Sequence, residues 1–285
     1  MGKLPGNACF LKMQETLRSV VKAWELDAVE HFTTAYYFRA LSTASMRMLA
    51  ELGWEAGDAT TPWTSHCWTR FFKELNAGDA YHVLSGLVEA KGEDILLGHQ
   101  LFNSETDELC TSFLQRCKGK PNTNRLPDAI VWSERESERR AKAAPGVQWV
   151  ATAKTIVRPE DLDGRGLLDL TALIHHSSDA NVQVQNAIGM TSSYMRENRI
   201  GYSTAEYQLS CKSPPPPLGT ALETRTTVAH LGRTSLWFLH EIHDATRDQP
   251  FATLAQFGVH LDMAARRPAP VPETIRKRAE ALMGH

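Results

Sequence analysis

A carboxylate, two hydroxyls and an amide interrupt an apolar pattern in the stretch 173–189. Apolar residues recur there at close to helical spacing, which predicts a helix with one buried face. The middle of that pattern holds Ser177, Ser178, Asp179 and Asn181. An acid among apolar residues is costly unless it is solvated, paired or used in chemistry. We therefore expect this helix to lie across a sheet and to line a cleft with a partly buried Asp179.

The two halves of the chain repeat each other. Placing residue 20 over residue 156 aligns VVKAWELDAV (20–29) with IVRPEDLDGR (156–165) without a gap. Placing residue 99 over residue 240 aligns 99–115 with 240–256, and the Pro-rich insert at 214–217 precedes this change of offset. Such self-similarity indicates two fused units of roughly 130 residues, an ordinary domain size.

Each unit has the same predicted order of elements. A β-branched strand leads through a polar turn into a helix that ends at Gly53 or Gly189, and a meander of strands separated by turn signals follows. The expected strands of the meander are 66–75, 81–90, 95–102 and 109–115 in the first unit, and 202–210, 221–230, 235–244 and 251–261 in the second. One helix followed by antiparallel strands predicts an α+β fold with a sheet wrapped around a helix.

Four segments divide the chain on this interpretation. The first unit spans 15–116, a charged linker spans 117–146, the second unit spans 147–263 and a C-terminal tail spans 264–285. The two fused units can replace a homodimer, and the sequence leaves open whether two chains associate further.

Composition limits the function classes. A net charge of -2 provides no general basic surface for nucleic acid or anionic membranes, and no apolar run approaches the ~18 residues of a spanning helix. The five cysteines are odd in number and include no C-x-x-C pair, which favours free thiols over a disulfide framework or a zinc site. We expect a cytoplasmic protein with no metal and with neither nucleic acid nor membrane as a partner.

A strand, a long helix and an antiparallel meander, duplicated in tandem, resemble the hotdog fold of acyl-CoA thioesterases and hydratases. The resemblance covers 15–116 and 147–263. It implies a double hotdog, in which two helix-wrapped antiparallel sheets pair into one continuous sheet. It also implies active sites between the helix of one unit and the strands of the other.

The run DAVEHFTTAYY, which starts at Asp27, resembles the signature of the 4-hydroxybenzoyl-CoA thioesterase group. The resemblance implies that Asp27 is the catalytic carboxylate, with His31 and Tyr37 as substrate-binding residues beside it. The sequence departs from the group at Glu30, where the group prefers a glycine that forms a tight turn. An aspartate before a helix is also a candidate N-cap, and Asp163 occupies the equivalent place in the second unit.

The letters SSDAN, which include Asp179 and Asn181, resemble the active-aspartate motif of double-hotdog acyl-CoA thioesterases of the type II group. The resemblance implies that Asp179 is the general base and that Asn181 contacts substrate. Its companions in that group are a hydroxyl on the next strand, which Ser203 or Thr204 fits, and a glutamine on the last strand, which Gln256 fits. The alternative is structural, with Asp179 capping a local helix irregularity and Gln256 satisfying a strand edge.

The resemblance implies a thioesterase that hydrolyses an acyl-CoA or acyl-carrier-protein thioester to free acid and thiol. A carboxylate would assist the attack of water, and no cofactor is expected beyond the coenzyme A that belongs to the substrate. Two alternatives stay open. Asp179 to Gln183 spells D-x-x-x-Q, as in polyketide dehydratase domains, so a hotdog hydratase or dehydratase is one, and a noncatalytic acyl-CoA-binding protein is the other.

Overall fold

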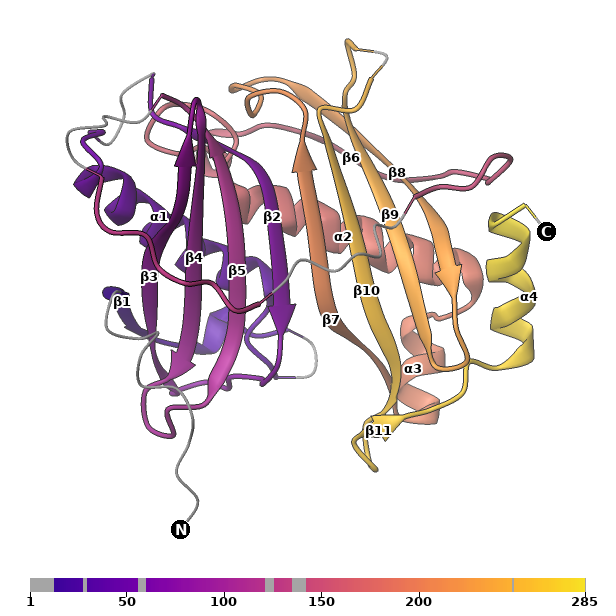
Figure 1. Ribbon diagram of the computed structural model, residues 1–285. Helices are drawn as coiled ribbons and strands as arrows, with labels where there is room; N and C mark the ends of the chain where they lie inside the picture. Colours follow the sequence, from indigo (N-terminus) through magenta and orange to yellow (C-terminus); the bar gives the residue numbers. More distant parts are fainter. Residues whose placement is uncertain are drawn as a thin grey trace. The chain divides into compact units, whose positions relative to one another are not determined.

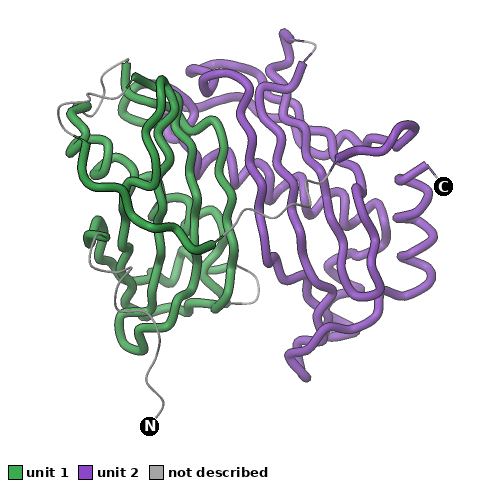
Figure 2. Tube along the Cα trace, viewed as in Figure 1, with its two compact units in different colours: residues 1–137, 163–165 green, residues 138–162, 166–285 purple. Residues whose placement is uncertain are grey.

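The computed structural model describes residues 13–27, 30–55, 60–120, 126–134, 142–247 and 249–284. The chain forms two compact units, one of residues 1–137 with 163–165 and one of residues 138–162 with 166–285 (Figure 2).

The first unit is an antiparallel sheet with one long helix against it. Its strands lie in the order β1-β3-β4-β5-β2 (Figure 1). They are β1 (Gln14–Val20), β2 (Trp63–Phe71), β3 (Ala80–Lys91), β4 (Asp94–Asn103) and β5 (Leu109–Lys118). A 3-10 turn (Ala23–Glu25) precedes helix α1 (Thr34–Glu51), which contacts β1, β3 and β4. The helix buries Phe38, Leu41 and Met48 against the sheet because apolar residues recur along one of its faces.

The second unit repeats this order as β6-β8-β9-β10-β7. Its strands are β6 (Val150–Ile156), β7 (Ile200–Cys211), β8 (Ala221–Leu231), β9 (Ser235–Asp244) and β10 (Ala252–Asp262). A 3-10 turn (Pro159–Asp161) precedes helix α2 (Leu170–Ile188), and α3 (Ser192–Asn198), β11 (Arg267–Pro268) and α4 (Glu273–Leu282) have no counterpart in the described part of the first unit. The predicted tandem of helix-wrapped antiparallel sheets is confirmed, and the pairing of the two sheets with each other stays a prediction.

Irregularities in the strand ladders repeat with the fold. The β1–β3 register shifts between Glu15 and Leu17, and the β6–β8 register shifts between Ala151 and Ala153. Thr16 and Thr152 are therefore the extra residues of equivalent bulges. A bulge bends the strand and re-aims a side chain. These two threonines begin the polar chains described below.

The segment 264–285, expected as a tail, is part of the second unit. Helix α4 packs against β8 and α2. Its Ile275 and Ala279 are buried in one apolar cluster with Val184, Ile188 and Val228. Burying the apolar face of α4 against β8 and α2 stabilises the fold, so α4 completes the core of the second unit.

Part of the expected linker lies on the first sheet, on the face opposite α1. Gly86 and Gly98 are cross-strand neighbours. A Cβ on Gly86 would lie 2.7 Å from Ile130, and a Cβ on Gly98 would lie 2.4 Å from Trp132. The Ile130 N–H donates to the Leu87 carbonyl over 2.7 Å. The paired glycines thus make room for residues 126–134 to cross the sheet.

Gly98→Ala is expected to destabilise the protein by about 1–3 kcal/mol, since the added methyl forces Trp132 off the sheet. Urea unfolding measures the effect. In a Trp132→Ala background the same substitution should cost little, because the clash is gone. An equal cost in both backgrounds would show that Trp132 does not set the requirement for glycine.

Two expectations from composition can be compared with the structure. Cys67, Cys110, Cys117 and Cys211 are free, as expected, and the structure shows that all four are buried; Cys9 lies outside the described residues. Within the described ranges, no helix combines the length and the apolar character needed to cross a membrane.

Candidate active site

Strands β7 and β10 bring together two of the predicted catalytic residues. The side chain of Gln256 is buried, and its carboxamide nitrogen lies 2.7 Å from Thr204 Oγ1. The register shift in this ladder leaves Ala205 as an extra residue beside Thr204. Neighbouring residues of a strand point to opposite faces, so Ser203 and Thr204 cannot both face Gln256. Of the two candidate hydroxyls, Thr204 is the one in contact with the glutamine.

A buried polar chain continues from Gln256 across the second sheet. His240 Nδ1 lies 2.8 Å from Thr226 Oγ1, and Thr226 Oγ1 lies 2.8 Å from Thr152 Oγ1 at the β6 bulge. Burial lowers the pKa of His240 to about 4, although the facing Gln256 side chain acts in the opposite direction. No hydrogen bond of standard geometry joins Gln256 Oε1 to His240 Nε2, and both atoms are buried. The two groups nevertheless face each other, since the Gln256 side chain acts on the pKa of His240.

The first unit carries the same chain at equivalent positions. Its members are Thr16, Ser85, His99, Gln115 and Thr64. The Thr16–Ser85 and Ser85–His99 contacts are each 2.7 Å long, and His99 Nε2 lies 3.2 Å from Gln115 Oε1. The carboxamide nitrogen of Gln115 lies 2.7 Å from Thr64 Oγ1. Burial lowers the pKa of His99 to about 4 as well. Both histidines are therefore neutral near pH 7.

The polar chain of side chains in the first unit differs from that in the second at two positions. In the first unit, Ser45 Oγ donates to Gln115 Oε1 over 2.5 Å, and Cys117 hydrogen-bonds to Thr64. Asn181 takes the place of Ser45 in the repeat, and its Oδ1 is buried without a hydrogen-bond partner in the described chain. Gly258 lies opposite Thr204 as Cys117 lies opposite Thr64. In the first unit two further side chains thus bond to Gln115 and to Thr64, and the described residues of the second unit provide no equivalent bonds.

Asp179 lies on the exposed face of α2, so its expected burial is wrong. The buried stripe of the helix includes Ser177 and Ala180, which places Asp179 on the opposite side. The hydroxyls of Ser177 and Ser178 donate to the carbonyls one turn earlier over 2.9 Å, so the helix itself satisfies them. Among the described residues, no hydrogen bond joins Asp179 to Gln256 or to Thr204. Its catalytic role stays a prediction.

The loop before α1 holds Asp27 in a tight turn. Its Oδ1 accepts from the His31 N–H over 3.0 Å, and its own N–H donates to the His31 carbonyl over 2.8 Å. Glu30 adopts the left-handed conformation, with φ of 64°, that glycine favours. The turn therefore forms despite the departure from the group's glycine. The N-cap of α1 is Thr33, so the N-cap interpretation of Asp27 is wrong.

His31 and Tyr37, the two residues of this loop and helix predicted to bind substrate, are partly exposed and buried in the core respectively. His31 Nε2 is 3.3 Å from Glu74 Oε2, and both side chains are partly exposed. Tyr37 is buried, with its ring centroid 4.6 Å from that of Phe32 and 5.5 Å from that of Phe71. Burial also raises the pKa of the Tyr37 phenol. Tyr37 thus belongs to the core, and a substrate-binding role for either residue stays a prediction.

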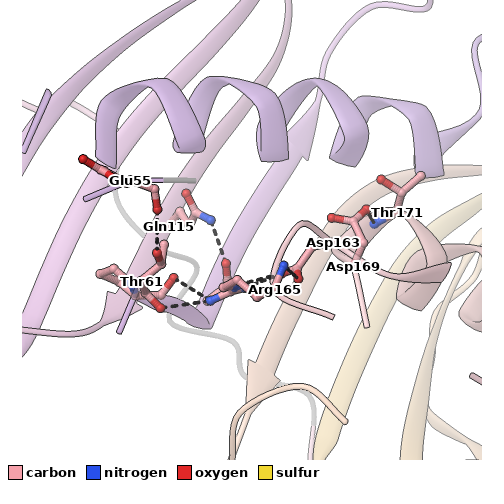
Figure 3. Close-up of polar contacts among 9 residues, drawn as sticks. Glu55, Thr61, Gln115, Asp163, Arg165, Asp169 and Thr171 are labelled. Carbon is pink, nitrogen blue, oxygen red and sulfur yellow. Dashed lines mark hydrogen bonds and ion pairs between the residues drawn. The ribbon is translucent and has the colours of Figure 1, made fainter. Parts of the chain in front are cut away.

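Asp163, the counterpart of Asp27, is bound by an arginine. Arg165 donates from Nε over 2.8 Å and from Nη2 over 2.6 Å to Asp163 Oδ2, and from Nη1 over 2.9 Å to the Thr61 carbonyl (Figure 3). Asp163 and Arg165 are both largely buried and lie in the first compact unit. The N-cap of α2 is Asp169, whose side chain accepts from the Thr171 N–H, so Asp163 is no cap either.

Arg165→Met is expected to destabilise the protein by about 3 kcal/mol, because the largely buried Asp163 carboxylate loses its ion pair with Arg165. Urea unfolding at pH 7 measures the change. Adding Asp163→Leu to Arg165→Met should recover much of the loss, since no unpaired charge then remains. If the double variant is as unstable as the sum of the two single variants, the ion pair is not the cause.

The sequence interpretation missed the histidines of the polar chains and Arg165. Its repeat alignment already pairs position 99 with 240 and position 115 with 256. A polar residue repeated at a strand's buried positions is the signal that could have found them. Within the part of the chain that the structure describes, no group of three or more His, Cys, Asp or Glu side chains could hold a metal ion.

Comparison with known proteins gives a consistent result. The family model of the thioesterase-like superfamily matches residues 21–145 and again 157–279. Two similar solved structures are an acyl-ACP thioesterase from Bacteroides thetaiotaomicron and the 12:0-ACP thioesterase from Umbellularia californica. The first is 8% identical with a TM-score of 0.63, and the match covers 86% of this chain and 97% of the Bacteroides chain. The second is 11% identical with a TM-score of 0.63, and the match covers 90% of this chain and 100% of the Umbellularia chain. At this identity the likeness shows the fold alone. No curated protein matches the chain significantly.

Proposed function

Because the chain belongs to the thioesterase-like superfamily, we propose that it hydrolyses an acyl thioester to a free acid and a thiol. The observation that carries this proposal is the family match to both halves of the chain. The Asp27 loop belongs to the first unit, and the Gln256–Thr204 pair belongs to the second.

Asp27 is the carboxylate that assists the attack of water. Its turn fixes one carboxylate oxygen against the His31 N–H, directly before the N-terminus of α1. A helix N-terminus directs N–H groups and partial positive charge outward, which suits the oxyanion that forms when a thioester carbonyl is attacked. The repeated carboxylate of Asp163 is instead occupied by its ion pair with Arg165. Asp179 is the second candidate, since its exposure leaves it accessible.

Gln256 and Thr204 hold water or the substrate through hydrogen bonds. Both polar groups lie at the end of a buried chain that restricts their movement. Preorganised polar groups lower the cost of ordering at the transition state. Asn181, with its buried Oδ1 lacking a partner among the described residues, is a further candidate for a substrate contact.

The acyl group is carried by coenzyme A or by an acyl carrier protein. Both structural neighbours act on acyl-ACP according to their names, so the substrate panel includes acyl carrier protein as well as coenzyme A. The free buried thiols support a reducing compartment, the cytoplasm. Association of two chains stays a prediction.

Mass spectrometry on a panel of acyl-CoA and acyl-ACP substrates tests the function. Hydrolysis releases free thiol and acid. Hydration adds water while the thioester stays intact, and a binding protein changes neither. We prefer hydrolysis to the dehydratase alternative because the family model that matches both halves is that of the thioesterase-like superfamily. Failure of every substrate to release thiol would contradict the proposal.

A further inference from the structure

The polar chain of the second unit begins at a backbone carbonyl. Thr152 Oγ1 lies 3.1 Å from the Thr224 carbonyl oxygen and 2.8 Å from Thr226 Oγ1. A carbonyl oxygen can only accept, and a threonine hydroxyl has one proton to donate. Thr152 therefore donates to the carbonyl, and Thr226 donates to Thr152.

This choice fixes the next two hydrogen bonds. Thr226 has used its proton, so across the 2.8 Å contact it accepts from His240 Nδ1–H. His240 is neutral because burial lowers its pKa to about 4, and a neutral imidazole carries one proton. Its Nε2 is consequently an acceptor, and this atom faces Gln256.

Gln256 must then present its nitrogen to His240. In the structure the carboxamide oxygen faces His240, the nitrogen faces Thr204, and neither Gln256 Oε1 nor His240 Nε2 has a hydrogen-bond partner within the described chain. A half-turn of the carboxamide exchanges its oxygen and nitrogen, and the surrounding network decides between the two orientations. After that half-turn, the nitrogen donates to His240 Nε2 and the oxygen accepts from Thr204.

We propose that Thr152, Thr226 and His240 are positioning residues that set the direction of the hydrogen bonds through Gln256. As a result, the Thr204 hydroxyl donates its proton to the carboxamide oxygen of Gln256. Thr204 then offers only an oxygen lone pair to any other group. Resting on the proposed hydrolysis, this assigns Thr204 to accept a hydrogen bond from the attacking water. It excludes Thr204 as a donor to the oxyanion, which requires a proton that Thr204 has already used.

The first unit contains the same direction, and there a hydrogen-bond donor already occupies the threonine oxygen. The same half-turn of the Gln115 carboxamide places its nitrogen against His99 Nε2 and Ser45 Oγ, so Ser45 then accepts from the nitrogen in place of donating to the oxygen. Thr16 lies 3.2 Å from the Val83 carbonyl, which fixes that chain in the same way. Thr64, the counterpart of Thr204, contacts the Cys117 thiol. Burial raises the pKa of Cys117 to about 12, so the thiol keeps its proton and donates to Thr64. Gly258 replaces this cysteine in the second unit, so it supplies no such donor to Thr204.

The protonated nitrogen of His240 tests this direction without any substrate. Long-range ¹H–¹⁵N correlation spectra of the histidine-labelled full chain, with the signals assigned from a His240→Gln variant, distinguish the two neutral tautomers. We expect the Nδ1–H form in wild type. In Thr152→Val the Thr226 proton loses its acceptor and turns to His240 Nδ1, so the Nε2–H form should dominate. Thr152→Ser keeps the hydroxyl and should retain the wild-type tautomer. The Nε2–H form in wild type, or no change in Thr152→Val, overturns the proposal.

Kinetics provide the second readout, with a matched control in the other unit. Thr152→Val should lower kcat about tenfold, the effect of one hydrogen bond in the transition state, and leave KM within about twofold. Thr16→Val removes the equivalent hydroxyl from the first unit and should leave kcat within about twofold. Equal kcat values for the two variants overturn the proposed role. If wild type hydrolyses no thioester, the proposed function fails, while the tautomer still decides the direction of the chain.

Discussion

Replacing Asp27 with asparagine is expected to lower kcat for thioester hydrolysis by about a thousandfold, the range of a lost general base. The amide is isosteric with the carboxylate and still offers an oxygen to the His31 N–H, so the turn stays formed. It cannot accept a proton from water. Initial rates of thiol release with a saturating substrate measure the change, and thermal unfolding checks that stability is preserved.

Two other aspartates serve as comparisons for this variant. Asp179→Asn alters an exposed side chain of α2 and should change kcat by less than about twofold. Asp163→Asn alters the repeat counterpart of Asp27, which Arg165 already binds, and should affect stability more than kcat. A large loss in Asp179→Asn with none in Asp27→Asn would move the base to α2. No loss in either would show that neither carboxylate assists the reaction.

Acidification from pH 6.5 to pH 4 is expected to destabilise the protein by roughly 3 kcal/mol for each of His99 and His240. Both residues are fully buried, and burial lowers each pKa from 6.5 to about 4. In this window the unfolded chain binds a proton at each histidine that the folded chain does not bind. Stability therefore rises with pH from about 4 to 6.5 and is lost as the pH falls. Urea unfolding at pH 7 and at pH 4.5 measures the difference.

Single substitutions isolate the contribution of each histidine. His99→Gln and His240→Gln remove one titrating group each and should each remove a similar part of the pH dependence. The comparison is needed because burial also lowers the pKa of His176 and His260, which adds a dependence of the same sign. An unchanged pH dependence in both variants would show that these two imidazoles are not the source.

The repeat and its strands could be predicted from the sequence because alternation and turn signals are local. β9 (Ser235–Asp244) coincides with its predicted range, and β10 begins one residue later than predicted. Gln256 and Thr204 were also identified, because a glutamine and a hydroxyl at equivalent strand positions resemble a known motif. Their contact depends on the bulge at Ala205, which the sequence pattern does not reveal.

The environment of the acids could not be predicted in the same way. Asp179 interrupts an apolar helix pattern in the sequence, but it lies off the buried stripe that includes Ala180 and Val184. The local pattern around Asp163 suggests a helix cap, whereas its ion pair with Arg165 requires the three-dimensional path of the loop. Glu30 shows the limit of a residue-type rule, since it adopts a left-handed turn that glycine would favour. In each case the position of the residue in the folded chain, and not its type alone, decides its environment.

Hydrolysis in ¹⁸O-labelled water tests the central claim most directly. Wild-type protein is incubated with the acyl-CoA and acyl-ACP panel, and free thiol and acid are quantified by mass spectrometry. We predict equal amounts of thiol and acid, with solvent oxygen in the carboxyl group of the acid, and slow release by Asp27→Asn. Intact thioesters, or solvent oxygen on the acyl chain of an unreleased thioester, would contradict the assignment of this chain as a thioester hydrolase.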